Sequence, residues 1–255
     1  MTPRVSTIIL LTATFDPNGM VKTDLSDIHQ RIKAYKDALY FYNQFNTPIV
    51  FAENSCTDGK LMAELREIFP TVDFHFFNGN DFDKTLGKGY GESKIIEYAI
   101  KHSKYINDNT VLIKITGRII TTNIENIIKY YTNHDKVDIA VNTSSKGFPN
   151  SRLFIFKSFF FKKYFLPYQP LLNDSKNIYF EHALQKALIE GKVNGKNVQY
   201  IRYLPQFRGI SGSTSEDLEI NGFNLYVLSF KHLIKYHLIK FTHEKYWLNN
   251  IKCKI

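Results

Sequence analysis

Two stretches of the chain carry the polar residues and glycines that a phosphate-binding site requires. Residues 48–58 are an apolar run that ends in the polar segment ENSCTD, with Glu53 at its start. Residues 87–118 begin with the glycine-lysine segment GKGYG, continue in a helical pattern and end in an apolar run followed by TGR. Polar strand ends beside a glycine-rich segment are how open α/β sheets bind nucleotides. The two stretches therefore predict a nucleotide site.

Three cationic residues could neutralise the phosphates of such a nucleotide. Lys88 lies within the glycine segment, whose backbone amides can approach an anion. Lys114 stands inside an apolar strand, where a charge is costly unless it is paired. Arg118 follows that strand and offers a planar fork suited to phosphate, although it could also pair with a neighbouring carboxylate. Lys94, in the first turn of the helix, is either a further contact or a solvated lysine.

The order and spacing of these segments resemble the nucleotide-sugar glycosyltransferases of the GT-A fold, especially the inverting family that makes bacterial surface polysaccharides. In that family an acidic strand end with a D-N-G-S-T-D-like turn is followed by a G-x-x-x-A-R-N-x-G segment and then by a strand ending in a metal-binding D-x-D motif. Here residues 53–58 stand at the first place and residues 89–94 at the second. The segment Lys114-Ile115-Thr116-Gly117-Arg118 stands where D-x-D is expected. The resemblance covers residues 5–145.

The resemblance implies roles for the strand ends. Thr12 and Thr14 would bond the base or ribose, unless they only cap the end of the first strand. Glu53 would do the same with a longer reach than an aspartate, whereas Asp58 is better explained as the N-cap of a helix. Residues 211–213 could wrap the donor or acceptor, or form an ordinary turn. The predicted donor-binding residues are Thr12, Thr14, Glu53, Lys88, Gly89, Gly91, Lys94, Lys114, Thr116, Gly117, Arg118, Ser211, Gly212 and Ser213.

The cationic residues at the D-x-D position predict how the departing diphosphate is neutralised. Protein side chains would do so instead of a metal ion, as in metal-independent glycosyltransferases, and no cofactor is then expected. A literal D-x-D occurs at Asp81-Phe82-Asp83, in the loop before the glycine segment. If these two aspartates bind a metal ion, Mg²⁺ or Mn²⁺ is the alternative expectation for a cofactor.

An inverting glycosyl transfer also needs a carboxylate that takes the proton of the acceptor hydroxyl, on the side of the sugar opposite the diphosphate. Glu181, at the start of a predicted helix late in the domain, is the first candidate, and Asp174 is the second. Both acids could instead compensate a helix dipole. Arg118 completes the predicted catalytic set because it would stabilise charge on the leaving group.

Strand and helix patterns alternate through the first half of the chain. This alternation predicts an α/β fold with a mostly parallel, Rossmann-like sheet and helices on both faces. The predicted strands are residues 5–11, 48–52, 72–77, 111–115 and 137–142, and the predicted helices are residues 27–45, 57–69, 91–105 and 123–131.

The second half has fewer signals. It predicts an antiparallel strand at 152–156, a helix at 177–190, a strand at 199–204 and a helix at 223–241. The expected domain is residues 1–222, with a donor half at 1–145 and an acceptor half at 146–222. Residues 223–255 form a basic C-terminal extension, in which Phe230, Leu233, Ile234, His237, Leu238 and Phe241 share a helical face and Lys231, Lys235 and Lys240 lie off it. This helix either rests on an anionic membrane or packs on the domain.

Composition limits the class of partner and the compartment. The 255 residues carry a formal net charge of +9, which suits phosphorylated substrates, anionic membranes or nucleic acid. Cys56 and Cys253 are too few for a disulfide framework, so a reducing cytosol fits. The apolar run near the N-terminus is too short for a signal peptide or a membrane span. We expect a cytoplasmic protein, with peripheral contact at the inner face of the cytoplasmic membrane as the further expectation.

The resemblance to the GT-A enzymes implies a glycosyltransferase that moves a sugar from a nucleotide-sugar donor to a hydroxyl of a surface glycan or glycolipid. One alternative is a nucleotidyltransferase of related topology, which would need carboxylates holding Mg²⁺; the cationic residues 114–118 argue against it. Another is a nucleic-acid-binding module. The basic residues are dispersed and form no recognition motif, so nucleic acid is not an expected partner.

Overall fold

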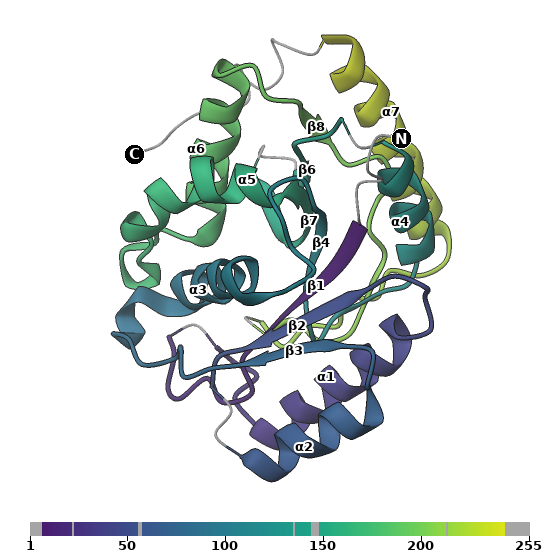
Figure 1. Ribbon diagram of the computed structural model, residues 1–255. Coiled ribbons are helices and arrows are strands. Elements are labelled where there is room, and N and C mark those ends of the chain that lie inside the picture. Colours follow the sequence, from purple (N-terminus) through teal and green to yellow (C-terminus); the bar gives the residue numbers. More distant parts are fainter. Residues whose placement is uncertain are drawn as a thin grey trace.

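The structure is a computed structural model that describes residues 7–21, 23–55, 58–134, 136–143, 148–212 and 214–242, with side chains as far as Ile239. Seven strands of this part of the chain form one sheet in the order β3-β2-β1-β4-β7-β6-β8 (Figure 1). β7 runs antiparallel to its neighbours β4 and β6, and every other pair is parallel. The strands are β1 Thr7–Ala13, β2 Ile49–Glu53, β3 Asp73–Phe76, β4 Val111–Thr116, β6 Ile139–Thr143, β7 Pro149–Lys157 and β8 Val198–Tyr200.

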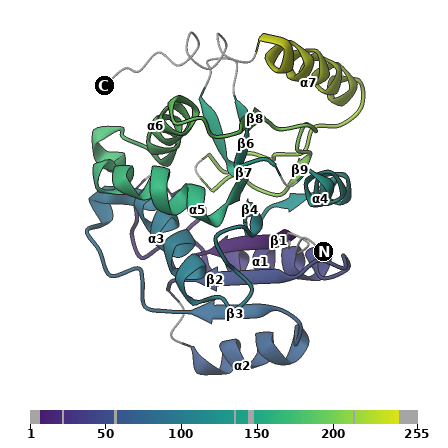
Figure 2. The same ribbon diagram turned by 45° about the horizontal axis from the view of Figure 1, so that its top comes forward.

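Helices cover both faces of the sheet, as Figure 2 shows from a second direction. Alternate residues of β1 point to opposite faces: Ile9 and Leu11 pack in the core cluster of α1, α2 and α4, and Ile8 and Leu10 in that of α3 and α6. The helices are α1 Ile28–Tyr42, α2 Gly59–Ile68, α3 Gly87–His102, α4 Ile124–Asn133, α5 Ser158–Phe160, α6 Phe180–Val193 and α7 Phe223–Thr242. Short strands β5 Ile120–Thr121 and β9 Phe207–Arg208 pair separately. The predicted α/β class, with a mostly parallel sheet, helices on both faces and a C-terminal helix, is confirmed.

The glycine segment differs from its prediction. The sequence predicts a helix only from residue 91, but α3 begins at Gly87, so residues 87–91 are its first turn. The reason is close packing. Gly87 has φ +79°, and a Cβ there would lie 2.3 Å from the Asp174 side chain. A Cβ at Gly89 would lie 2.9 Å from the backbone nitrogen of Phe180. These glycines let the start of α3 touch its neighbours.

The second half of the chain is more helical than predicted. Residues 158–171 form consecutive short helical turns that cover the sheet beside α3 and α6. The predicted strand 199–204 is confined to β8, while the predicted antiparallel strand at 152–156 is the central part of β7. Cys56, Cys253 and the end of the predicted extension, residues 243–255, lie outside the described residues. No described helix is long and apolar enough to cross a membrane.

The C-terminal helix α7 packs on the domain through one face. Tyr236 and Ile239 belong to the core cluster beneath α3 and α6. His232 is buried, and its Nε2 lies 3.0 Å from the carbonyl of Ile201 at the end of β8. Lys235 donates to the side chain of Thr143, at the end of β6, over 2.8 Å. α7 is thereby attached to two strand ends.

His232 makes this attachment sensitive to acid. Burial, together with the nearby charges of Lys235 and Arg202, lowers the pKa of His232 from 6.5 to about 4. Between these pH values the unfolded chain binds a proton that the folded chain does not, so stability falls as the pH falls from 6.5 toward 4. We expect this group to account for a loss on the order of 3 kcal/mol over that range. The variant His232→Gln should lose less stability over this pH range, which urea unfolding at a series of pH values can measure. If the free energies of unfolding of the two proteins fall in parallel with pH, the role of His232 is contradicted.

Candidate functional site

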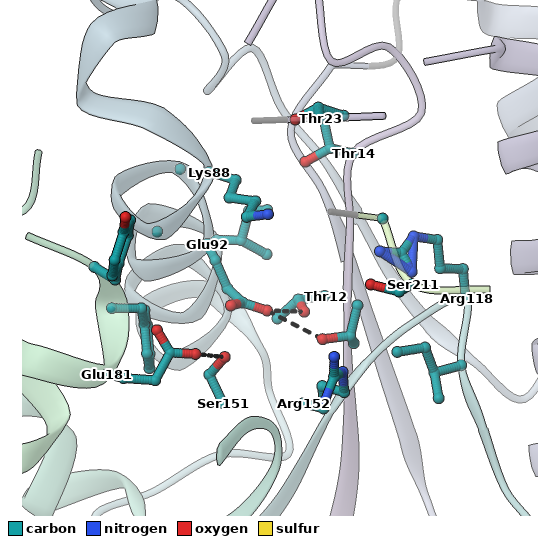
Figure 3. Close-up of a pocket in the computed structure, with 18 of the residues that line it drawn as sticks. Thr12, Thr14, Thr23, Lys88, Glu92, Arg118, Ser151, Arg152, Glu181 and Ser211 are labelled. Carbon is teal, nitrogen blue, oxygen red and sulfur yellow. Dashed lines mark hydrogen bonds between the residues drawn. The ribbon is translucent and has the colours of Figure 1, made fainter. Parts of the chain in front are cut away.

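The principal cavity has a volume of about 420 Å³ and lies at one edge of the sheet. The carboxyl ends of β1, β4 and β6 meet there, together with the first turn of α3, and the antiparallel β7 contributes its amino end. The segment at Ser211 and Gly212 and the start of α6 complete the walls. Figure 3 shows the labelled side chains around this space.

A buried ion pair lies at the floor of the cavity. Lys114, on β4, is 0% exposed, and its Nζ donates to Oε1 of Glu92 on α3 and to the carbonyl of Ser151 on β7 over 2.7 Å. The hydroxyl of Thr12, at the end of β1, donates to the same Glu92 oxygen over 3.1 Å (Figure 3). Burial lowers the pKa of Lys114, and the neighbouring Glu92 opposes that change. The pair therefore joins three strands and one helix, and Lys114 supports the cavity from below without lining it.

Further cations line the wall. Nη1 of Arg118 donates to the carbonyl of Ile210 over 3.3 Å, and a Cβ at Gly212 would lie 2.1 Å from Nη2 of the same guanidinium. Burial lowers the pKa of Arg118. Arg152, on β7, has no hydrogen-bond or ion-pair partner for its guanidinium within the described residues. Lys88, from the first turn of α3, lies across the cavity from Arg118 (Figure 3). Such a wall favours an anionic ligand.

A fourth cation, Arg31, organises the loop that follows β1. It is 6% exposed and donates to the carbonyl of Thr14 over 2.8 Å from Nε and to that of Leu25 over 2.9 Å from Nη1. These carbonyls satisfy most of its donors. Arg31 therefore holds the loop in place while its charge adds to the positive potential of the cavity.

Two acids outside the buried pair also line the cavity. Glu181 lies in the first turn of α6, and its Oε1 accepts a hydrogen bond of 2.5 Å from the hydroxyl of Ser151 (Figure 3). Asp174 is 1% exposed and packs against the first turn of α3. Burial raises the pKa of Asp174, whereas Lys88 and the amides of Lys88 and Gly89 oppose that change. The N-terminus of α3 thus faces a protein carboxylate.

The structure brings most of the predicted site residues together. Glu181, Asp174 and Arg118, which form the predicted catalytic set, all line the cavity. Ser213 lies outside the described residues. The predicted donor-binding residues that line the cavity are Thr12, Thr14, Lys88, Gly89, Gly91, Thr116, Arg118, Ser211 and Gly212.

Four predicted donor-binding residues lie elsewhere. Lys114 is the buried cation described above. Glu53 is fully buried and accepts hydrogen bonds from the amides of Phe15 (2.7 Å) and Ser55 (3.0 Å), so it supports the turn after β1 from behind. Lys94 lies along α3 and pairs with Glu97 at 3.0 Å. Gly117 donates its amide to the carbonyl of Thr12 over 2.8 Å.

Two of the acids considered as a helix cap or as metal ligands, Asp58 and Asp83, make local hydrogen bonds. Asp58 is the N-cap of α2 and accepts from the amides of Lys60 and Leu61. Asp83 accepts from the amide of Thr85 over 2.9 Å, and neither Asp81 nor Asp83 lines the cavity. The described residues contain no group of three or more His, Cys, Asp or Glu side chains placed to hold a metal ion.

Sequence reasoning did not place Glu92, Arg31, Ser151 and Arg152 in the site. Glu92 carried a usable signal, because a lysine inside an apolar strand requires a countercharge and Glu92 lies one turn after Lys88 on the helix before that strand. Ser151 and Arg152 carried none. They reach the cavity only because β7 inserts antiparallel beside β4, which spacing along the chain does not reveal.

The Glu92–Lys114 pair can be tested by its effect on stability. Glu92→Gln leaves a buried ammonium without its countercharge, and we expect a loss of about 3–5 kcal/mol in the free energy of unfolding. The double variant Glu92→Gln/Lys114→Met removes both charges and should recover most of that loss. The control is Glu64→Gln, which breaks the exposed Lys36–Glu64 pair and should cost less than about 1 kcal/mol. Equal urea-unfolding midpoints for Glu92→Gln and the control would contradict this role.

Neither a protein-family model nor a curated protein sequence matches the chain. Among solved structures, it is similar to a nucleotide-diphospho-sugar transferase from Desulfovibrio desulfuricans G20, with 12% identity, a TM-score of 0.44 and coverage of 77% of this chain and 79% of the other. It is also similar to the galactosyltransferase LgtC in complex with donor and acceptor sugar analogues (11%, TM-score 0.45, 76% and 72%). A cytidylyltransferase from Leptospira borgpetersenii is similar as well, with 13% identity, a TM-score of 0.44 and coverage of 93% of this chain and 95% of the other.

Glycosyltransferases and nucleotidyltransferases are both among these solved structures. At these identities and TM-scores, the activity of the chain has to be inferred from its own cavity.

Proposed function

We propose that this protein is a glycosyltransferase that moves a sugar from a nucleotide-sugar donor to a hydroxyl group of a glycan acceptor. One observation carries the proposal: the cavity at the carboxyl ends of β1 and β4 is lined by the cations Lys88, Arg118 and Arg152 and by the carboxylate of Glu181. A sugar diphosphate needs cations at its phosphates and, for inversion, one carboxylate at the acceptor hydroxyl.

The cations would act on the departing diphosphate. Negative charge grows on the leaving group as the glycosidic bond breaks, and fixed positive groups in a partly closed cavity stabilise that charge. Arg118 is held by the carbonyl of Ile210, so its guanidinium is oriented before the donor binds. The guanidinium of Arg152 is available to a phosphate, because no described residue occupies it. We infer that these side chains perform the neutralisation that a D-x-D-bound metal performs in the family that the chain resembles.

The three acids of the cavity are suited to different tasks. Glu92 is engaged by Lys114, Thr12 and Thr116, so its charge is compensated within the protein. Asp174 is almost completely enclosed and faces the first turn of α3. Glu181 is half-buried at the cavity wall and is oriented by one hydrogen bond from Ser151. We therefore assign the general base to Glu181, with Asp174 as the next candidate.

The proposed activity predicts both a ligand and a product. A thermal-shift screen against UDP-, GDP-, CMP- and dTDP-sugars should raise the melting temperature with one nucleotide class, because a ligand bound only by the folded chain stabilises it. Turnover of that donor with a glycan acceptor should release the nucleotide part of the donor. Release of pyrophosphate from a nucleoside triphosphate and a sugar phosphate would instead identify a nucleotidyltransferase. Binding of oligonucleotides without binding of any nucleotide sugar would contradict both the glycosyltransferase and the nucleotidyltransferase assignment.

Arg118→Ala tests the neutralisation of the diphosphate. If Arg118 acts on charge that grows in the transition state, the variant should lose kcat by about 10²-fold or more while donor affinity falls much less. Calorimetry and initial rates separate the two quantities. Arg208→Ala is the matched control, because Arg208 is exposed on β9 and does not line the cavity. Activity should also persist in EDTA; complete loss in EDTA with recovery on adding Mn²⁺ would refute neutralisation by side chains.

Glu181→Gln tests the base. The substitution keeps the size of the side chain and removes the charge that accepts the proton, so turnover should fall by roughly 10²–10⁴-fold while the donor still binds. Glu190→Gln, near the other end of α6 and away from the cavity, is the control and should retain activity. Near-normal turnover of Glu181→Gln would exclude Glu181, and Asp174→Asn would be measured next. If neither variant loses activity, retention of configuration at the anomeric carbon, read by NMR, would exclude an inverting base.

A further inference from the structure

The helix α7 presents a continuous apolar stripe to solvent. The stripe consists of Phe223, Tyr226, Phe230, Leu233, Ile234 and Leu238, which recur at three- and four-residue steps and so share one face of the helix. All six side chains are exposed, and Phe223, Tyr226 and Phe230 are 80%, 77% and 64% exposed. Figures 1 and 2 show α7 at the edge of the molecule. A contiguous exposed apolar face of this kind marks an interaction surface.

The described contacts of α7 with the sheet and its core come from other residues. His232, Tyr236 and Ile239 are buried on the opposite face of the helix, and Lys235 donates to Thr143. Packing on the domain and exposure of the stripe are therefore compatible. The sequence offered them as alternatives, but four of the apolar residues that it grouped on one helical face, Phe230, Leu233, Ile234 and Leu238, are exposed to solvent.

The charges along α7 indicate the chemistry of the partner. The chain contains no acidic residue between Glu219 and Glu244, and α7 carries three lysines within this interval. Lys231 is exposed beside the apolar stripe, and the whole chain carries a net charge of +9. A surface that combines large apolar side chains, aromatic rings and positive charge complements the boundary between the headgroups and acyl chains of an anionic bilayer.

We propose that the apolar stripe of α7 binds the surface of an anionic lipid bilayer, with the helix lying in the plane of the interface. Phe223, Tyr226 and Phe230 enter the headgroup boundary, and Lys231 contacts the anionic headgroups at its side. A second copy of the chain is a poorer match for the same stripe, because it would bring two helices without acidic residues, and two chains of charge +9, against each other.

Vesicle sedimentation tests the proposal directly. The full chain should sediment with vesicles of phosphatidylcholine and phosphatidylglycerol in equal parts, and much less with phosphatidylcholine alone. Phe230→Ser/Ile234→Ser should weaken binding to the anionic vesicles by about tenfold or more, because two large apolar side chains no longer leave water. The controls Tyr40→Ser and Val193→Ser remove exposed apolar side chains from α1 and α6 and should bind as the unmodified chain does. Lys231→Gln should weaken binding only to the anionic vesicles, and less at high salt.

A fluorescence measurement locates the contact independently of any loss of binding. Trp247 is the single tryptophan, so Phe230→Trp in a Trp247→Phe background gives one reporter on the stripe. Its emission should shift to the blue with anionic vesicles and be quenched by brominated lipids, whereas Val193→Trp in the same background should be unaffected. Absence of binding to anionic vesicles, or equal quenching at both positions, would overturn the proposal. So would a dimer in sedimentation velocity that Phe230→Ser/Ile234→Ser dissociates, since the stripe would then bind a second copy.

Discussion

The buried contact between Lys114 and Glu92 is the constraint on which the cavity depends. A lysine with no exposure to solvent is costly unless a carboxylate and further acceptors surround it. Glu92 and the carbonyl of Ser151 meet that requirement, and in doing so they fix α3 and β7 against β4. Because the hydroxyl of Thr12 bonds the same carboxylate, the end of β1 is held as well. The walls of the cavity are therefore positioned by the group that lies beneath it.

This arrangement leaves a surplus of positive charge above the pair. The charge of Lys114 is matched by Glu92, and Arg31 and Arg118 donate to backbone carbonyls, which carry no net charge. Arg152 has no partner within the described residues. Glu181 and Asp174 offset part of this charge at the side of α6. An anion placed between the two groups of residues would gain from the cations without having to displace a protein carboxylate from them, which is the electrostatic basis of the proposed donor site.

The sequence predicted the elements of the first half well because buried parallel strands are continuous apolar runs and helices repeat every three or four residues. It failed where one residue type serves two purposes. The sequence predicts a helix only from residue 91, but the glycines at positions 87 and 89 allow α3 to begin at residue 87, close against Asp174 and Phe180. Glu53 ends a strand as a binding residue would, yet its oxygens satisfy the amides of the turn after β1. Tertiary structure decides which backbone groups need a hydrogen-bond partner, and residue spacing along the sequence does not reveal it.

The C-terminal helix connects the cavity to the surface of the molecule. Lys235 of α7 bonds Thr143, and the hydroxyl of Tyr200, which contacts His232 of α7, also bonds Asn142. Asn142 and Thr143 line the principal cavity and also a second cavity of about 380 Å³ beside α7. The same helix thus holds one cavity wall with its inner face and presents the apolar stripe with its outer face. Because both faces belong to one helix, binding of the stripe to a bilayer, as proposed above, would set the orientation of the cavity relative to the bound surface.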